Sequence, residues 1–272
     1  MIRRWVVVVV VDIKQLELLY FSNDEPVIYK LKNERSKDYI ITIKPIKVID
    51  WAIFENCIDV FVQEKQDYND INILSMSYLD FIYKVLIPST KKEDGTSING
   101  IKLAKVLELS LGMTDIKTGT YKGKSCLVLC DSIVITSKEF EDIRKIILFQ
   151  NIEDYDDRYV SPDVKQLYHD YLKTINANTV NPSLERKKTF VISKTGIMMS
   201  EINKMSYRIF NQIYVGAVEI DIYYANKIIQ ASQKYDVKED INYPLFTEKK
   251  DKYANIFVSK GSVEHKLGKI NG

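Results

Sequence analysis

The sequence predicts an α+β protein, with an N-terminal mixed strand and helix part and a mainly helical C-terminal part. Three observations lead to this fold class. Runs of β-branched residues and alternating apolar patterns dominate the first fifty residues. Apolar residues then recur at three- and four-residue steps, the period of an amphipathic helix. A capping-box pattern near residue 136 opens a stretch whose pattern is helical almost to the end.

The first strands come from three segments. The apolar run from Trp5 to Val11 predicts a buried strand, because Val loses side-chain freedom in a helix and packs well on a pleated surface. The run is too short to cross a bilayer, and no small-residue cleavage site of a signal peptide follows it. The segments "VIYKLK" and "YIITIKP", at 27–32 and 39–45, predict two further strands because apolar and polar residues alternate.

From residue 48 to residue 135, three helices are expected, followed by short strands. The spacing of apolar residues predicts a helix over 48–62, and Ser77 with Asp80 predicts the start of a second. A third helix over 101–111 ends at Gly112, a residue that adopts the left-handed conformation needed beyond a helix end. Short strands are expected from there to residue 135.

Thr136 and Glu139 form the most specific helix-start signal in the chain. The threonine hydroxyl accepts from the backbone three residues on, and the glutamate reaches back. Later helix starts are expected at Ser161, Asn181 and Ser206. We therefore divide the chain into a mixed part, 1–135, and a helical part, 136–272. No Pro/Gly/Ser-rich linker marks this boundary, so one continuous domain remains an alternative.

Composition narrows the classes of function. The 39 Lys and Arg against 37 Asp and Glu give a net charge of +2, which provides no electrostatic footprint for nucleic acid or a membrane surface. Three cysteines without a CxxC pair indicate a reducing compartment. Cys126 and Cys130 lie in an apolar run and are expected to be buried small side chains. The sequence predicts no catalytic residues, no cofactor, no metal site and no small-molecule substrate.

The segment "TGTYKGKSCLVLCD", residues 118–131, resembles the end of a phosphate-binding loop. Such a loop needs four residues between its glycines and a helix after it, whereas Gly119 and Gly123 are separated by three residues and the following "CLVLCDSIVI" has a strand pattern. We therefore predict a β-hairpin with a glycine-containing turn. Asp131 is expected to form a turn at the end of the next strand.

The segment "EDYDDRYVSPD", residues 153–163, gathers carboxylates, including Asp154, Asp156 and Asp157. Counted from Asp154, a calcium loop would need Gly and Glu where Tyr159 and Lys165 stand. A solvated loop between helices is the main prediction. A cation site and a partner-binding loop remain alternatives.

Candidate partner contacts are predicted on the helix over 219–235. Its apolar positions cover more than a narrow stripe, so the helix needs burial on two sides, by the core and by a partner. The residues predicted to contact a partner are Tyr223, Tyr224, Ile228, Asp154, Asp156 and Asp157.

Several whole segments resemble an uncharacterised family of proteins encoded among the tail-assembly genes of tailed bacteriophages of low-GC Gram-positive hosts. The segments are "LYFSNDEPVIYKLKN", "MSYLDFIYKVLI", "FQNIEDYDDRYVSPDV" and "NPSLERKKTFVISKTGIMMSEINKMSYRIFNQIY". None is a mechanistic motif, and the Val-rich start of this chain departs from the family.

The resemblance implies a non-enzymatic virion structural or tail-assembly role, including that of a chaperone, in the host cytoplasm during infection and in the virion. The partners it implies are other phage proteins and further copies of the chain. Two alternatives remain. One is a phage-encoded regulatory or host-defence-modulating binding protein. The other is an enzyme whose site assembles from scattered residues, with the three aspartates as its first candidates.

Overall fold

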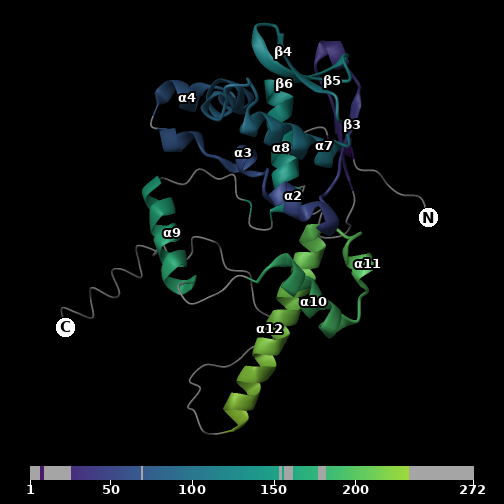
Figure 1. The fold of residues 1–272 in the computed structure, drawn as a ribbon, viewed down its shortest axis with the longest axis vertical. Coiled ribbons are helices and arrows are strands. Elements are labelled where there is room, and N and C mark those ends of the chain that lie inside the picture. The colour runs from purple at the N-terminus through teal and green to yellow at the C-terminus, as the bar shows by residue number, and fades with distance from the viewer. Residues whose placement is uncertain are drawn as a thin grey trace, which may run out of the picture. The chain divides into compact units, whose positions relative to one another are not determined.

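A computed structural model describes residues 7–8, 26–68, 70–152, 155, 162–176 and 182–232, and the fold is of the predicted α+β class (Figure 1). The chain forms two compact units. Unit 1 comprises Met1–Tyr155 and Ile197–Gln212, and unit 2 comprises Asp156–Gly196 and Ile213–Gly272. Thr136, where the sequence pattern becomes helical, is the N-cap of a helix that belongs to unit 1.

The first sheet of unit 1 contains β1 (Val7–Val8), β2 (Val27–Lys30) and β3 (Ile40–Ile43) in that order. β1 runs parallel to β2, and β3 runs antiparallel to it. The alternating pattern of "VIYK" buries Val27 and Tyr29 on one face. The three strands predicted from the N-terminal segments therefore exist at these residues.

Short helical elements follow the first sheet. They are η1 (Glu34–Ser36), η2 (Val48–Asp50), α2 (Trp51–Glu55), α3 (Asp59–Val62), η3 (Lys65–Tyr68), α4 (Ile71–Ser75), α5 (Tyr78–Phe81), the π-helical turn η4 (Ile82–Leu86), α6 (Ile87–Ser89) and α7 (Ile98–Leu111). The predicted continuous helix over 48–62 is wrong, because a turn at 56–58 separates α2 from α3. Phe54 and Phe61 are nevertheless both buried.

The predicted ends of two of these helices are confirmed. The Ser77 side chain accepts a hydrogen bond from the Asp80 backbone N–H, and the helical segment from Tyr78 continues to Ser89. α7 ends at Gly112, whose φ of 69° places it in the left-handed region.

The second sheet contains β4 (Ile116–Tyr121), β5 (Lys124–Leu129) and β6 (Ile133–Thr136), joined as two antiparallel hairpins. Lys122 and Gly123, both with positive φ, form the two-residue turn between β4 and β5. A strand follows this turn, so the predicted hairpin is confirmed. Asp131 also has positive φ and lies in the second turn, as predicted.

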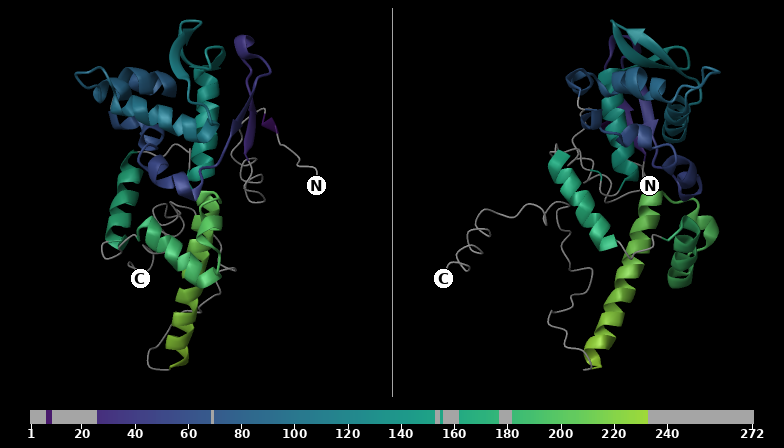
Figure 2. Two further views of the ribbon diagram at one scale, coloured as in Figure 1. Left: turned by 45° about the vertical axis from the view of Figure 1, so that its right-hand side comes forward. Right: turned by 60° about the vertical axis from the view of Figure 1, so that its left-hand side comes forward.

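Helix α8 (Ser137–Asn151) lies at the centre of unit 1, between the first sheet and the α4–α5 segment (Figures 1 and 2). Its apolar face buries Phe140, Ile143, Ile146 and Ile147, as the sequence pattern predicts. Its last turn is tied to the first sheet, because Gln150 Nε2 donates to the Ile43 carbonyl at 3.1 Å. The helix thus organises the core of the unit.

Glu139 joins three segments of unit 1 through its side chain. Its two oxygens accept from the backbone N–H groups of Lys32, Asn33 and Thr136 at 2.6–3.0 Å, and from the Asn33 amide and Thr136 hydroxyl. The residue is only 4% exposed. Burial would raise its pKa, but the hydrogen bonds from Thr136, Lys32 and Asn33 outweigh burial and lower that pKa. The predicted capping box is therefore also a junction between distant segments.

The remaining helices of unit 1 are α11 (Met199–Ile202) and the start of α12 (Tyr207–Ala231). The Tyr207 ring stacks on Trp51, with centroids 3.4 Å apart and planes at 5°. Arg208 Nη1 donates to the Phe149 carbonyl at 2.6 Å. The predicted helix start at Ser206 is confirmed, since its hydroxyl accepts from the Ile209 N–H.

Unit 2 contains α9 (Pro162–Asn176), α10 (Leu184–Thr195) and the rest of α12. Phe190 of α10 meets Tyr214 of α12 edge-to-face at 5.7 Å, and Lys194 pairs with Asp221 at 2.6 Å. α10 begins at Leu184, and the side chain of Ser183 accepts from the backbone N–H of Arg186. The predicted helix starts at Ser161 and Asn181 lie outside the described residues. Among the described residues, no helix is both long and apolar enough to span a membrane.

Candidate functional site

The predicted partner-contact residues divide between described and undescribed parts of the chain. Tyr223, Tyr224 and Ile228 lie on α12, whereas Asp154, Asp156 and Asp157 lie outside the described residues. Tyr224 is 57% exposed and Ile228 is 70% exposed. The two side chains are four residues apart, so they lie on one side of the helix.

Tyr223 lies on another side of α12. Its ring meets that of Tyr224 edge-to-face at 5.5 Å, and the Lys227 ammonium lies 5.7 Å from its centroid. Three other exposed apolar residues, Val215, Ile222 and Ile229, recur at seven-residue spacing. Exposed apolar side chains thus occupy two sides of the helix. Within α12, all of whose residues are described, only Phe210 is buried.

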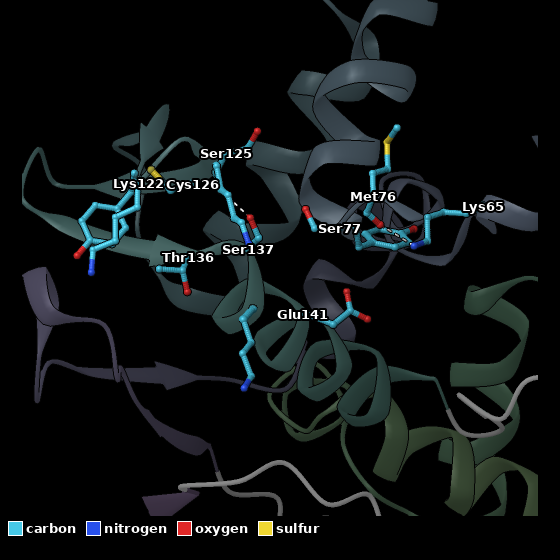
Figure 3. Close-up of a pocket in the computed structure, with 13 residues that line it drawn as sticks. Lys65, Met76, Ser77, Lys122, Ser125, Cys126, Thr136, Ser137 and Glu141 are labelled. Atoms are coloured by element: carbon cyan, nitrogen blue, oxygen red, sulfur yellow. Dashed lines mark hydrogen bonds between the residues drawn. The ribbon is translucent and has the colours of Figure 1, made fainter. Parts of the chain in front are cut away.

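A pocket of about 650 Å³ lies in unit 1, which we call the hairpin pocket (Figure 3). Its walls come from the β4–β5 hairpin, from the first turns of α8 and from the segment that runs from η3 into α5. These elements are far apart in sequence. The second sheet and α8 bring them together, since both β5 and α5 pack against α8. The volume is typical of ligand-binding pockets.

The interior of the hairpin pocket is largely apolar. Met76, Tyr78, Tyr121 and Cys126 contribute to its lining. The Tyr78 hydroxyl donates to the Gln63 carbonyl at 2.9 Å, and burial raises its pKa to about 12, against the opposing effect of Arg144. Tyr78 is therefore fixed in place as a neutral wall of the pocket.

The three cysteines are free thiols in the structure. Burial raises the pKa of the Cys126 thiol, so this side chain is a protonated apolar group at neutral pH. The prediction of a buried side chain is confirmed for Cys126. It is wrong for Cys130, which is exposed because it belongs to the turn after β5 and has a φ of 49°.

Lysines surround the pocket. Lys65, Lys122, Lys124 and Lys138 all contribute to its lining, against the single carboxylate of Glu141. Figure 3 shows Lys122 and Lys65 at opposite ends of the group of side chains, with Glu141 projecting from α8. No local sequence pattern reveals this cluster, because the lysines come from three separate segments: η3, the β4–β5 hairpin and the start of α8.

Asp80 ties two walls of the pocket together. Its carboxylate accepts from the hydroxyls of Ser77 and Ser125, each at 2.6 Å, and pairs with Lys84 at 3.0 Å. Burial would raise its pKa, but the hydrogen bonds from Ser125, Ser77 and Lys84 lower it to about 2. The ionised Asp80 thus links α5 to the hairpin beneath the pocket.

Comparisons of the chain with protein-family models, with curated proteins and with solved structures give no match.

Proposed function

We propose that this chain is a non-enzymatic structural or tail-assembly protein of a tailed bacteriophage and that it works through protein–protein contacts. The exposed apolar surface of α12 is the observation that supports this proposal most directly. Tyr224 and Ile228, which share one side of the helix, are each more than half exposed, and so is Ile222 on another side. Large apolar side chains grouped in this way mark interaction sites in soluble proteins.

Covering these side chains provides a driving force for association. Complete burial of one large apolar side chain is worth about 1.5–3 kcal/mol relative to its exposed state. Burial of several such residues on one helix therefore contributes a substantial part of the free energy that association requires. The resemblance of whole segments to phage tail-assembly proteins supports placing that contact in the phage tail.

A pair of matched variants tests the role of α12. Ile228→Glu places a carboxylate on the exposed apolar surface, whereas Gln230→Glu adds the same charge beside Lys227, which already donates to Gln230 at 3.2 Å. In cells infected by a phage lacking the gene, we expect plasmid-borne Gln230→Glu to restore the yield of infectious particles. Ile228→Glu should lower that yield at least tenfold, because it prevents burial of the helix surface.

Circular dichroism and thermal unfolding of both purified variants provide the control for folding. Position 228 is already exposed, so its variant should unfold within a few degrees of the original protein. Equal particle yields from the two variants, with both folded, would contradict a contact role for this surface.

A further inference from the structure

The hairpin pocket combines an apolar interior with a cationic margin. We propose that it binds an acidic segment of a partner protein, with an aromatic or large aliphatic side chain seated inside and flanking carboxylates facing the lysines. This inference rests on the proposed function, because it names the chemistry of one partner. It concerns unit 1, and is therefore separate from the surface of α12.

The charge balance at the pocket favours an anionic ligand. Glu141 Oε1 is paired with Arg144 at 3.1 Å, and Lys122 is paired with Glu34 at 2.9 Å. Within the described residues, the ammonium groups of Lys124 and Lys138 have neither a hydrogen bond nor an ion pair. Together with Lys65, they leave an excess of positive charge at the margin.

Lys65 is held in position by neutral partners. Its ammonium donates to the carbonyls of Leu74 at 3.1 Å and Met76 at 2.8 Å. Carbonyls are neutral, so they orient the ammonium without cancelling its charge. Lys65 therefore adds a fixed cation to the margin of the pocket, which Lys124 and Lys138 also line.

The interior favours an apolar side chain as the anchor of this ligand. Met76 and Tyr78 lie on one side, and Tyr121 and Cys126 come from the hairpin. A volume of about 650 Å³ accommodates one aromatic side chain and part of the adjoining backbone. Interfaces commonly place such an anchor in a pocket and surround it with polar groups at the rim.

One further polar atom favours a peptide over a nucleic acid. Glu141 Oε2 is buried and, within the described residues, has no hydrogen-bond partner. A peptide backbone can supply the N–H donor that this oxygen lacks directly beside its acidic side chains. In a nucleic acid the phosphates that would face the lysines are acceptors, and only the bases carry N–H donors. Strands of nucleic acid also need a groove that follows many phosphates, and a single pocket with three uncompensated lysines does not provide one.

The proposal is tested by nuclear magnetic resonance titration of the full-length ¹⁵N-labelled protein with three peptides. The first is acetyl-Asp-Glu-Phe-Glu-Asp-amide. The second, acetyl-Asn-Gln-Phe-Gln-Asn-amide, keeps the shape without the charge. The third replaces the central Phe by Ala. We expect the first peptide to shift the amide signals of Tyr121, Lys122 and Ser125, and to bind about tenfold more tightly than either of the others.

Lysine-to-glutamine variants of the protein test whether the acidic peptide binds at the hairpin pocket. Lys124→Gln with Lys138→Gln should weaken binding of the acidic peptide about tenfold, because each lost rim pair is worth a factor of a few. The matched control, Lys91→Gln with Lys92→Gln, removes the same charge from an exposed loop and should leave the affinity unchanged. Equal affinity of the two double variants would overturn the proposal.

Two further experiments distinguish a partner's peptide from other ligands of the pocket. A hexamer of thymidylate that displaced the acidic peptide at equal concentration would overturn the choice of a peptide ligand. A rise in peptide affinity in the triple variant Asp154→Asn, Asp156→Asn, Asp157→Asn would assign the pocket to the chain's own acidic segment instead of a partner. The titration uses purified protein, so its failure would leave the particle-yield result for α12 unaffected.

Discussion

At the residue scale, Glu139 joins the start of its own helix to a segment more than one hundred residues away in sequence. Its capping box with Thr136 is predictable, because both partners lie within one turn of the same helix. Its hydrogen bonds to Lys32 and Asn33 span more than one hundred residues of sequence. No local pattern encodes that contact, and the same is true of the link from Asp80 to Ser125. Sequence reasoning therefore identified the helix cap and missed the junction.

Asp80 provides a prediction that depends on pH. Its pKa in the folded protein, about 2, is below the ordinary value of 3.8, so its contribution to stability is present above pH 4 and is lost as pH falls toward 2. We expect Asp80→Asn to lower the free energy of unfolding by about 2 kcal/mol at pH 7. Urea denaturation from pH 7 to pH 3 should show this difference shrinking as the solution becomes acidic.

Asp67→Asn is the matched control for Asp80, since Asp67 is an exposed acid in η3. It should change the free energy of unfolding by less than about 0.5 kcal/mol at any pH in this range. A cost for Asp80→Asn that stayed constant from pH 7 to pH 3 would show that the ionised carboxylate is not what holds the two walls of the pocket together.

At the scale of elements, local signals predicted the hairpins and most helix ends. The hairpin around Gly123 and the end of α7 at Gly112 are each determined by residues that lie close together in the sequence. The break between α2 and α3 was missed because the apolar residues on both sides keep the helical spacing and share a buried face. The exposure of Cys130 was not predicted, because the apolar run "CLVLC" continues up to the residue at which the turn begins.

Alanine substitution at two glycines is expected to change the free energy of unfolding in different ways. Gly123 has a φ of 74° in the β4–β5 turn, and Gly216 lies in α12 with open space where a Cβ would be. Gly123→Ala should lower the free energy of unfolding by about 1 kcal/mol, because an alanine in the left-handed region is strained. Gly216→Ala should leave it unchanged or raise it by up to about 1 kcal/mol, because alanine favours a helix.

Thermal and urea unfolding of the two glycine variants give the required measurement. Both changes add a single methyl group to an open site, so each serves as the control for the other. Equal effects of the same sign would mean that the turn conformation of Gly123 does not contribute to stability as the structure indicates.

At the scale of the whole molecule, the α+β class followed from the sequence because it depends only on the kind and order of elements. The two compact units did not, because unit 1 contains two separate segments of the chain. The hairpin pocket was also beyond prediction, since its walls meet only through the packing of β5 and α5 on α8. For the helix over 219–235, the broad apolar coverage predicted burial on two sides, by the core and by a partner. The structure leaves Ile222, Tyr224 and Ile228 exposed, and the partner contact stays a prediction.

The central claim is that the chain works by contact with phage tail proteins, and co-purification tests it most directly. An affinity-tagged chain would be recovered from infected cells, and the associated proteins would be quantified by mass spectrometry alongside purified virions. The account predicts tail proteins in amounts comparable to the chain, whether or not the chain remains in the finished particle. Recovery of the chain without tail proteins, together with its absence from virions, would contradict the account.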